Sequence, residues 1–383
     1  MLKIVHVADL HAGKTTARTL NRNEDLLKAL EEVKKLLKTE RVDYLIIAGD
    51  VFDKAIPDAD SEHLIYDFLV EVGLTGTKTV LIGGNHDSPR KLRNITPWSE
   101  KFKIKVFPSF DFNDFIYTDG EVAFVNLPFI SERAITELEG TEADAKITYA
   151  ERIRKLLLYA AERVKDYKYR ILTAHLFFGG VRLGNTEREI TVAETYAVDQ
   201  SAIPQTFHYA ALGHVHRYQR LEGAPTDAFY TGSLYQLDFG EAEQEKFFNF
   251  VVLEDNTARV EKVKVPLLRK LKKITVSGEE GLKTLAELDK NTYLWVQVKT
   301  DNAKKFLEIK TKLERLLGER LLKITPLYPE RRGGLLFKKE SAAFGGSVHN
   351  PIEMYRLYLQ SKGRNLDKKT EGVLKELLSQ LEF

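Results

Sequence analysis

The chain has 383 residues and no cysteine, so disulfides and cysteine-ligated zinc or iron–sulfur sites are excluded. Its formal net charge is only +2, so any nucleic-acid contact requires a local basic patch rather than the overall field. The length exceeds that of one typical core and indicates two or three domains. We find no secretory signal pattern and no run of roughly 18 apolar residues, so we expect a cytoplasmic protein without a membrane partner.

Short apolar runs alternate with helical patterns through the first two-thirds of the chain. The runs predict strands at 4–7, 42–48, 79–82, 170–173, 209–212 and 247–253. Apolar residues recur at helical spacing between them and predict helices at 23–38, 61–72 and 150–164. This order predicts a layered α/β domain over residues 1–265.

The pattern changes after about residue 265. A strand at 293–298, a helix at 303–317 and a strand at 321–325 predict a small second domain over 266–330. Residues 331–349 are rich in glycine, lysine and serine without periodicity, which indicates a linker. Two helices are then expected within 350–383, near 352–360 and 368–381.

Five polar clusters each follow an apolar run. They are Asp9-Leu10-His11, Gly49-Asp50, Gly84-Asn85-His86-Asp87, His175 and Gly213-His214-Val215-His216. Because ligands of an α/β sheet bind beyond the carboxyl ends of its strands, we expect these clusters to converge on one site. A phosphate loop at Gly13-Lys14-Thr15 is not expected, because Ala8 replaces the glycine that such a loop requires.

The side chains of these clusters suit a pair of divalent metal ions. Carboxylates, an amide oxygen and imidazoles fit manganese, iron or zinc better than calcium. A carboxylate such as Asp50 can bridge two ions about 3.5–4 Å apart, and such a pair stabilises charge on a phosphoryl group. The sequence therefore predicts a two-metal phosphoesterase site built from Asp9, His11, Asp50, Asn85, His175, His214 and His216.

The order and content of the five clusters resemble the calcineurin-like metallophosphoesterase superfamily. The longer runs at 49–53, 84–88 and 211–217, with Gly232-Ser233 and 238–241, resemble the SbcD branch of the double-strand-break repair nucleases. The resemblance covers nearly the whole chain. It implies a layered metallophosphoesterase β-sandwich flanked by helices, with a small α+β capping, DNA-binding domain at 266–330 and helices at the C-terminus.

The resemblance also implies roles for the residues of the site. One metal would be held by Asp9, His11, Asp50 and His216, and the other by Asp50, Asn85, His175 and His214. His86 would stabilise or protonate the leaving oxygen, and Asp87 would orient the His86 ring. Some relatives carry a second histidine three residues after the bridging aspartate. Asp53 stands there in this chain, so we assign it no catalytic role and leave the balance of exonuclease and endonuclease activity open.

The activity that the resemblance implies is a manganese-dependent DNA nuclease of double-strand break repair. It would be an exonuclease on duplex ends and an endonuclease on single strands and hairpins. The partners would be DNA, an SbcC-type coiled-coil ATPase and a second copy of the chain, whose contact would involve the helices after Asp53 and near 97–102. Rival interpretations are a calcineurin-like phosphatase or small-molecule phosphodiesterase, and a non-catalytic scaffold for DNA ends.

Two features leave alternatives open. The apolar stripes of the C-terminal helices either pack back on the body of the protein or dock on the ATPase, and we favour docking. The basic run Lys262 to Lys273 either contacts phosphates or is the solvated face of a strand.

Overall fold

The computed structural model describes residues 1–131, 134–135, 148–182, 197–255, 257–278 and 280–328, together with 356, 359, 366–367 and 370–372. The chain divides into two compact units, Met1–Leu327 and Tyr328–Phe383. The expected linker and most of the expected C-terminal helices lie outside the described residues. Within the described part of the chain, no helix is both long and apolar enough to cross a membrane.

A six-stranded sheet carries the N-terminal half of the site. Its order is β14 (Thr257–Val265), β13 (Lys246–Glu254), β1 (Leu2–Val7), β4 (Tyr44–Ala48), β5 (Lys78–Ile82) and β6 (Ile104–Phe107). Strands β1, β4, β5 and β6 are parallel, whereas β13 is antiparallel to both β1 and β14. The carboxyl ends of the parallel strands therefore share one edge.

A second six-stranded sheet carries the rest of the site. Its order is β11 (Gln219–Arg220), β12 (Asp227–Tyr230), β10 (Tyr209–Gly213), β9 (Tyr169–His175), β8 (Val122–Leu127) and β7 (Ile116–Asp119). Its four central strands are parallel, and β7 and β11 pair antiparallel at the edges. A short hairpin, β2 (Thr15–Thr16) and β3 (Leu20–Asn21), stands apart from both sheets.

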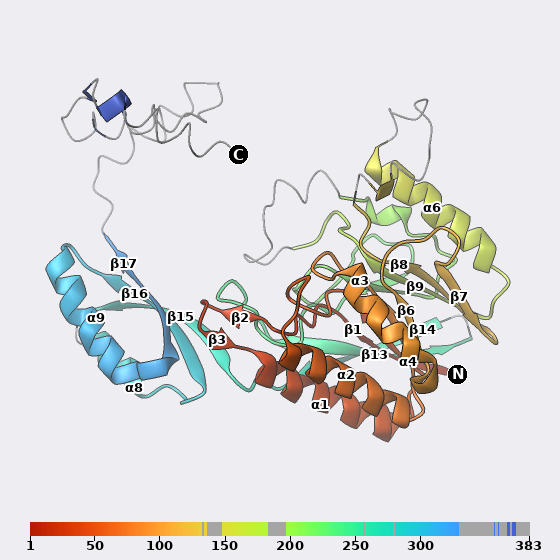
Figure 1. Ribbon diagram of the computed structural model, residues 1–383, viewed down its shortest axis with the longest axis horizontal. Coiled ribbons are helices and arrows are strands. Elements are labelled where there is room, and N and C mark those ends of the chain that lie inside the picture. The colour runs from red at the N-terminus through yellow and green to blue at the C-terminus, as the bar shows by residue number, and fades with distance from the viewer. Residues whose placement is uncertain are drawn as a thin grey trace. The chain divides into compact units, whose positions relative to one another are not determined.

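The two sheets pack face to face, and helices cover their outer faces. Ile4 and Ile46 of the first sheet share a buried cluster with Phe124 and Ile171 of the second. The alternate residues of the first sheet, such as Val5, pack against α1 (Asn23–Glu40) and α2 (Ala59–Leu74), which Figure 1 shows side by side. Helix α6 (Tyr149–Val164) covers the second sheet. Strands buried on both faces explain the unbroken apolar runs of the sequence.

Local signals fix where the helices begin. The Asp58 carboxylate accepts the backbone N–H of Ser61 at the start of α2. Thr148 and Glu151 form a reciprocal capping box at the start of α6. Short helical turns follow β5 and connect other elements. They are α3 (Pro89–Leu92), α4 (Thr96–Ser99) and the 3₁₀ turns Arg93–Ile95, Glu100–Phe102, Gln200–Ala202 and Gly318–Arg320.

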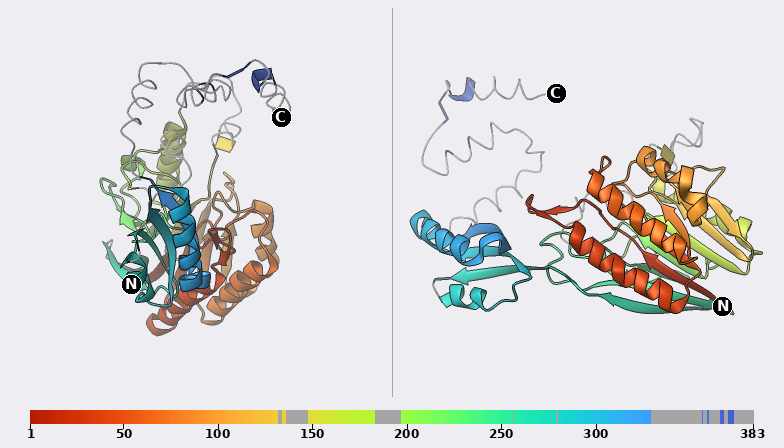
Figure 2. Two further views of the ribbon diagram at one scale, coloured as in Figure 1. Left: turned by 90° about the vertical axis from the view of Figure 1, so that its left-hand side faces the viewer. Right: turned by 60° about the horizontal axis from the view of Figure 1, so that its bottom comes forward.

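The cap, residues 270–327, is a three-stranded parallel sheet with two crossover helices. Its elements are β15 (Lys270–Ser277), α8 (Glu280–Ala286), β16 (Thr292–Lys299), α9 (Ala303–Leu317) and β17 (Leu321–Leu327). Both helices share one apolar cluster with the sheet, so they lie on the same face, and Figures 1 and 2 show the cap from three directions. The expected β-α-β pattern is present, preceded by a strand and helix that the sequence analysis did not identify. The cap belongs to the same compact unit as the sandwich, so the boundary at residue 265 stays a prediction.

Candidate metal centre

The expected site residues all follow strands that end at one edge of the sandwich. Asp9 and His11 follow β1, Asp50 follows β4, and Asn85 to Asp87 follow β5, and these strands are neighbours in the first sheet. His175 ends β9, and His214 and His216 follow β10, its neighbour in the second sheet. The structure therefore brings together all the clusters that the sequence analysis singled out.

The backbone that carries these residues is strained. Asp9, His11, Asp50 and His214 have φ angles of 52°, 43°, 50° and 97°, in the left-handed region that most residues avoid. Each such residue costs about 1–3 kcal/mol and persists only where its surroundings hold it. Strain of this kind gathers at functional sites, and here it aims polar side chains into a shared centre.

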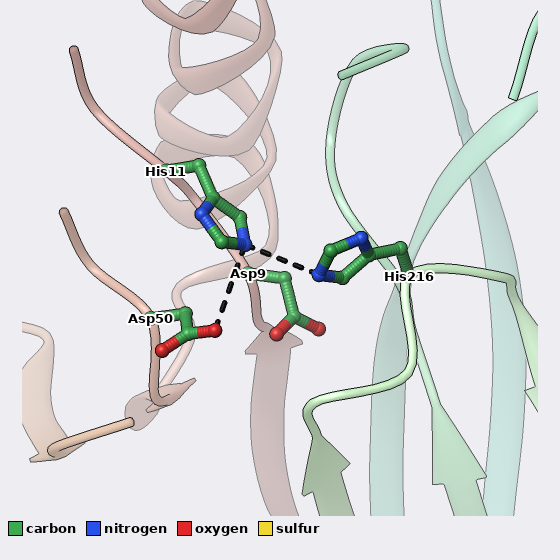
Figure 3. Close-up of side chains that lie close together, drawn as sticks. All are labelled: Asp9, His11, Asp50 and His216. Carbon is green, nitrogen blue, oxygen red and sulfur yellow. Dashed lines mark hydrogen bonds and ion pairs between the residues drawn. The ribbon is translucent and has the colours of Figure 1, made fainter. Parts of the chain in front are cut away.

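The first donor group consists of Asp9, His11, Asp50 and His216, each of which has one nitrogen or carboxylate oxygen within 4.8 Å of those of the others. The Nε2 atom of His11 is 3.2 Å from Nε2 of His216 and 3.6 Å from Oδ2 of Asp50. Figure 3 shows the four side chains pointing toward one another.

The second donor group consists of Asp50, Asn85, His175 and His214. The Asn85 Oδ1 atom lies 3.0 Å from His175 Nε2 and 2.8 Å from His214 Nδ1. The His175 Nδ1–H donates to the carbonyl oxygen of Ala48 at 2.8 Å, so Nε2 is the ring nitrogen that faces the centre. Asp50 Oδ2 is 3.5 Å from that Nε2 and therefore stands between the two groups.

Burial and charge perturb the titration of this centre. Burial raises the pKa of the Asp9 carboxyl and lowers the pKa of the His11 imidazole. Burial and neighbouring His175 lower the pKa of His214 to about 3. Burial opposes protonation of His175, but the adjacent Asp50 carboxylate prevails and raises the pKa of His175 to about 9. In the absence of a metal, a proton on His175 therefore compensates part of the buried negative charge.

The donor chemistry fits divalent metal ions. Asp9 and Asp50 are 0% and 1% exposed, a costly burial for carboxylates without a compensating cation. The Asp9 Oδ1 atom accepts the backbone N–H of His214, whereas its buried Oδ2 has no hydrogen-bond partner among the described residues. An unpartnered carboxylate oxygen beside several imidazole nitrogens is the environment that manganese, iron or zinc would satisfy.

Two glycines leave room for these side chains. A Cβ on Gly84 would lie 2.1 Å from Asp50 Oδ1, and one on Gly213 would lie 1.9 Å from the Ala48 carbonyl oxygen. Neither contact is possible between real atoms, so a larger residue at either position would displace the β4 turn that holds Asp50.

His86 lies at the margin of the first donor group, and the role expected for Asp87 needs correction. The His86 ring stands edge-on to the His11 ring, with centroids 4.8 Å apart. Its Nδ1 lies 2.9 Å from the carbonyl oxygen of Asp53, so Asp53 supplies the contact that was expected from Asp87. The Asp87 carboxylate instead accepts three backbone N–H groups, those of residues 51, 52 and 84. It ties the β4 turn to the β5 turn.

Sequence reasoning missed two carboxylates that face ligand histidines. Asp53 Oδ1 lies 3.4 Å from His11 Nδ1, and Glu241 Oε1 lies 3.3 Å from His216 Nδ1. Glu241 stands in the 238–241 run and Asp53 in the 49–53 run, and both runs supported the family resemblance. The sequence therefore marked both residues but did not indicate that they contact histidines. The contacts of Asp53 with His11 and of Glu241 with His216 join separate turns of the chain, so no local sequence pattern predicts them.

Comparison with known proteins places the chain among phosphoesterases. Residues 2–218 match the family model described as calcineurin-like phosphoesterase. The chain is 31% identical over 258 residues to the SbcD protein of nuclease SbcCD from Bacillus subtilis, covering 65% of this chain and 66%, just under two thirds, of that protein. It is 26% identical over 363 residues to the SbcD protein of nuclease SbcCD from Staphylococcus saprophyticus, covering 93% and 90% of the two chains. A solved structure of a dimetal phosphatase from Danio rerio is similar with a TM-score of 0.45 and 14% identity, over 70% of this chain and 97% of the other.

Proposed function

Because the chain belongs to the calcineurin-like phosphoesterase family, on its SbcD branch, we propose that it is the nuclease subunit of an SbcCD-type complex. It hydrolyses DNA phosphodiesters with two manganese ions, as an exonuclease on duplex ends and an endonuclease on single strands and hairpins, in double-strand break repair. One observation carries the two-metal part of this proposal. Asp50 Oδ2 lies 3.6 Å from His11 Nε2 and 3.5 Å from His175 Nε2, as a bridging carboxylate requires.

In this proposal the two donor groups are the two metal shells, which share Asp50. Bound there, divalent ions supply Lewis-acid stabilisation of the charge that develops on a phosphoryl group. His86 acts on the leaving oxygen: its Nδ1–H donates to the Asp53 carbonyl, which leaves Nε2 as the atom that transfers a proton. The Asp87 carboxylate joins the β4 turn to the β5 turn by accepting the backbone N–H groups of Val51 and Gly84.

The open face of the cap supports a nucleic-acid substrate over a small phosphomonoester. Strands β15, β16 and β17 contain no acidic residue, and the alternation that puts Trp295 on the open face also puts Lys273, Lys299 and Lys323 there. Lys273 and Lys323 flank Trp295 across the sheet, with their Nζ atoms 4.3 Å and 3.9 Å from its ring centroid. Phe239, from the same loop as Glu241, packs edge-on against Trp295. Lysines on the open face of the cap thus lie near the loop of Phe239 and Glu241, which reaches the metal centre. Such lysines can bind the phosphates of a nucleic-acid backbone.

The partners belong to the same proposal. The names of the relatives describe one subunit of nuclease SbcCD and so imply a second kind of subunit, and we assign residues 350–383 to binding an SbcC-type ATPase. We assign a homodimer contact to α2 and the turns at 96–102, where Tyr66, Trp98 and Phe102 form a half-buried row of aromatic rings. We place the complex in the cytoplasm.

Cleavage of end-labelled duplex and hairpin DNA by the purified chain with manganese tests the function. Wild-type protein should cut both substrates, and Asp50→Ala and His86→Ala should each lower the rate at least about 100-fold, as expected for loss of a bridging ligand or a general acid. Asp119→Asn is the matched control, because Asp119 pairs with Tyr44 and Lys78, which begin β4 and β5 at the other ends of those strands.

Two results would contradict the proposal. Efficient hydrolysis of a small phosphomonoester with both DNA substrates left intact would favour the phosphatase alternative. Full DNA binding by wild-type protein without any cleavage would favour the scaffold alternative.

A further inference from the structure

Both histidines of the first donor group have a carboxylate behind them, on the side away from the centre. His11 Nδ1 faces Asp53 Oδ1 at 3.4 Å, and His216 Nδ1 faces Glu241 Oε1 at 3.3 Å. The side chain of Asp53 is 11% exposed, and that of Glu241 is fully buried. In each case the ring nitrogen that points away from the centre meets the carboxylate, so the Nε2 atoms remain 3.2 Å apart and face each other.

Each carboxylate is itself fixed by a cation. Glu241 Oε2 accepts from Lys246 Nζ at 2.6 Å, from Ser233 Oγ and from the backbone N–H of Leu237, so its Oε1 is the atom presented to His216. Asp53 Oδ1 lies 3.0 Å from Lys14 Nζ. Two parallel chains, lysine to carboxylate to histidine, end at one metal position.

The second donor group is built differently. The Nδ1–H of His175 donates to the neutral carbonyl oxygen of Ala48. The His214 ring presents Nδ1 to Asn85 and is flanked by the rings of Phe129 and Phe177, at centroid distances of 6.3 Å and 6.4 Å. Apart from the shared Asp50, the groups that these two imidazoles meet at hydrogen-bond distance among the described residues are neutral.

We propose that Asp53 and Glu241 are positioning residues that orient His11 and His216 and make the first metal position the tighter of the two. A carboxylate that accepts the Nδ1–H fixes the tautomer with Nε2 free, locks the ring angle and makes Nε2 more basic toward a metal. A carbonyl oxygen orients a ring but adds less basicity. This inference rests on the two-metal assignment in the proposed function and adds which of the two metal positions binds its ion more tightly.

Manganese titration of the full-length protein, by calorimetry and by electron paramagnetic resonance, tests the inference. The wild-type protein should bind two ions in two distinguishable steps. Asp53→Asn and Glu241→Gln should each weaken the tighter step about 10- to 100-fold while the weaker step moves by less than about threefold. Asp53→Ala should lose more than Asp53→Asn, because asparagine keeps a side-chain oxygen that can face His11 Nδ1.

Matched variants separate positioning from folding. Asp119→Asn removes a distant carboxylate, so it should keep the two-step titration. Lys14→Met removes the cation from Asp53 but leaves the carboxylate, so it should weaken the tighter step by less than Asp53→Asn does. Glu241→Gln leaves the buried Lys246 unpaired, so thermal unfolding in chelator is measured for every variant. If Glu241→Gln unfolds, the two Asp53 variants and Lys14→Met still test the inference at the pair formed by Asp53 and His11.

The outcomes distinguish this inference from the function on which it rests. Wild-type protein that binds fewer than two manganese ions would contradict the proposed function itself. Two ions bound by wild-type protein, with folded Asp53 variants unchanged or weakened only in the looser step, would overturn the inference alone.

Discussion

At the scale of single residues, the site depends on positions where no side chain is allowed. Gly84 places its Cα against the Asp50 carboxylate, and a Cβ there would lie 2.1 Å from Oδ1. Gly84→Ala should therefore move the shared ligand and lower the cleavage rate by about 100-fold, as displacements near 1 Å do in enzymes. Gly179→Ala is the control, because the nearest atom to its Cβ would be 3.8 Å away. Equal activity of the two variants in the DNA-cleavage assay would contradict this account.

The protonation of His175 predicts how metal binding responds to pH. Its pKa of about 9 in the metal-free protein means that a metal ion must displace a proton from Nε2 below that pH. Because an imidazole can bind metal only through an unprotonated nitrogen, manganese affinity should rise as pH increases from 6 to 8 if His175 is a ligand as proposed. The rise should be up to about tenfold per pH unit for one proton displaced. Calorimetry in buffers of different ionisation enthalpy counts the protons released. Affinity that does not vary over this range would show that His175 is already neutral.

The site residues that could be predicted from the sequence all end or follow a buried strand. Asp9, Asp50, Asn85 and His214 follow buried parallel strands, whose apolar runs are visible locally and whose ends must meet at one edge. Asp53 and Glu241 could not be assigned in this way, because their partners His11 and His216 come from other turns and the pairing depends on three-dimensional packing.

At the scale of elements, the predicted strands and helices were those with two buried faces or a clear apolar stripe. Strands β14 and β15 were not predicted with bounds, and the solvated face of a strand was only one of two interpretations of their basic run. Their lysines alternate with apolar residues on strands with exposed faces, which weakens the local signal. The structure puts Lys262 and Lys264 on β14 and Lys270, Lys272 and Lys273 on β15. Several strands of the second sheet, among them β7 and β8, were also missed.

The lysine-bearing face of the cap predicts a salt-dependent contribution to DNA binding. Replacing Lys273 and Lys323 together by glutamate should weaken duplex binding and reduce the slope of log affinity against log salt by about 2, because each lysine that neutralises a phosphate contributes about 1 to that slope. Fluorescence anisotropy over a salt series measures both quantities. Lys310→Glu is the control, because Lys310 lies on α9, where it pairs with Glu314. An unchanged slope in the double variant would assign the DNA contact to another surface.

At the scale of the whole molecule, we propose that the chain separates catalysis from assembly. The metal centre lies within residues 1–327, whereas residues 328–383 form a separate compact unit. Deleting residues 350–383 should therefore leave manganese-dependent cleavage of simple DNA ends intact and abolish co-purification with the ATPase subunit. An ATPase that still co-purifies with the truncated chain would place the docking surface in the sandwich or the cap.

The two donor groups also join the two sheets of the sandwich. Asp9, His11, Asp50 and Asn85 extend from the first sheet, and the remaining histidines from the second, so each shell contains donors from both. A metal ion bound in either shell is therefore a cross-link between chain segments far apart in sequence, such as those of His11 and His216, and it favours the folded ensemble by mass action. At a free concentration about 100 times its dissociation constant, one such ion adds about 2.7 kcal/mol. If divalent ions bind there as proposed, the centre also holds the two sheets together, and loss of metal should loosen the edge of the sandwich that holds the strained turns.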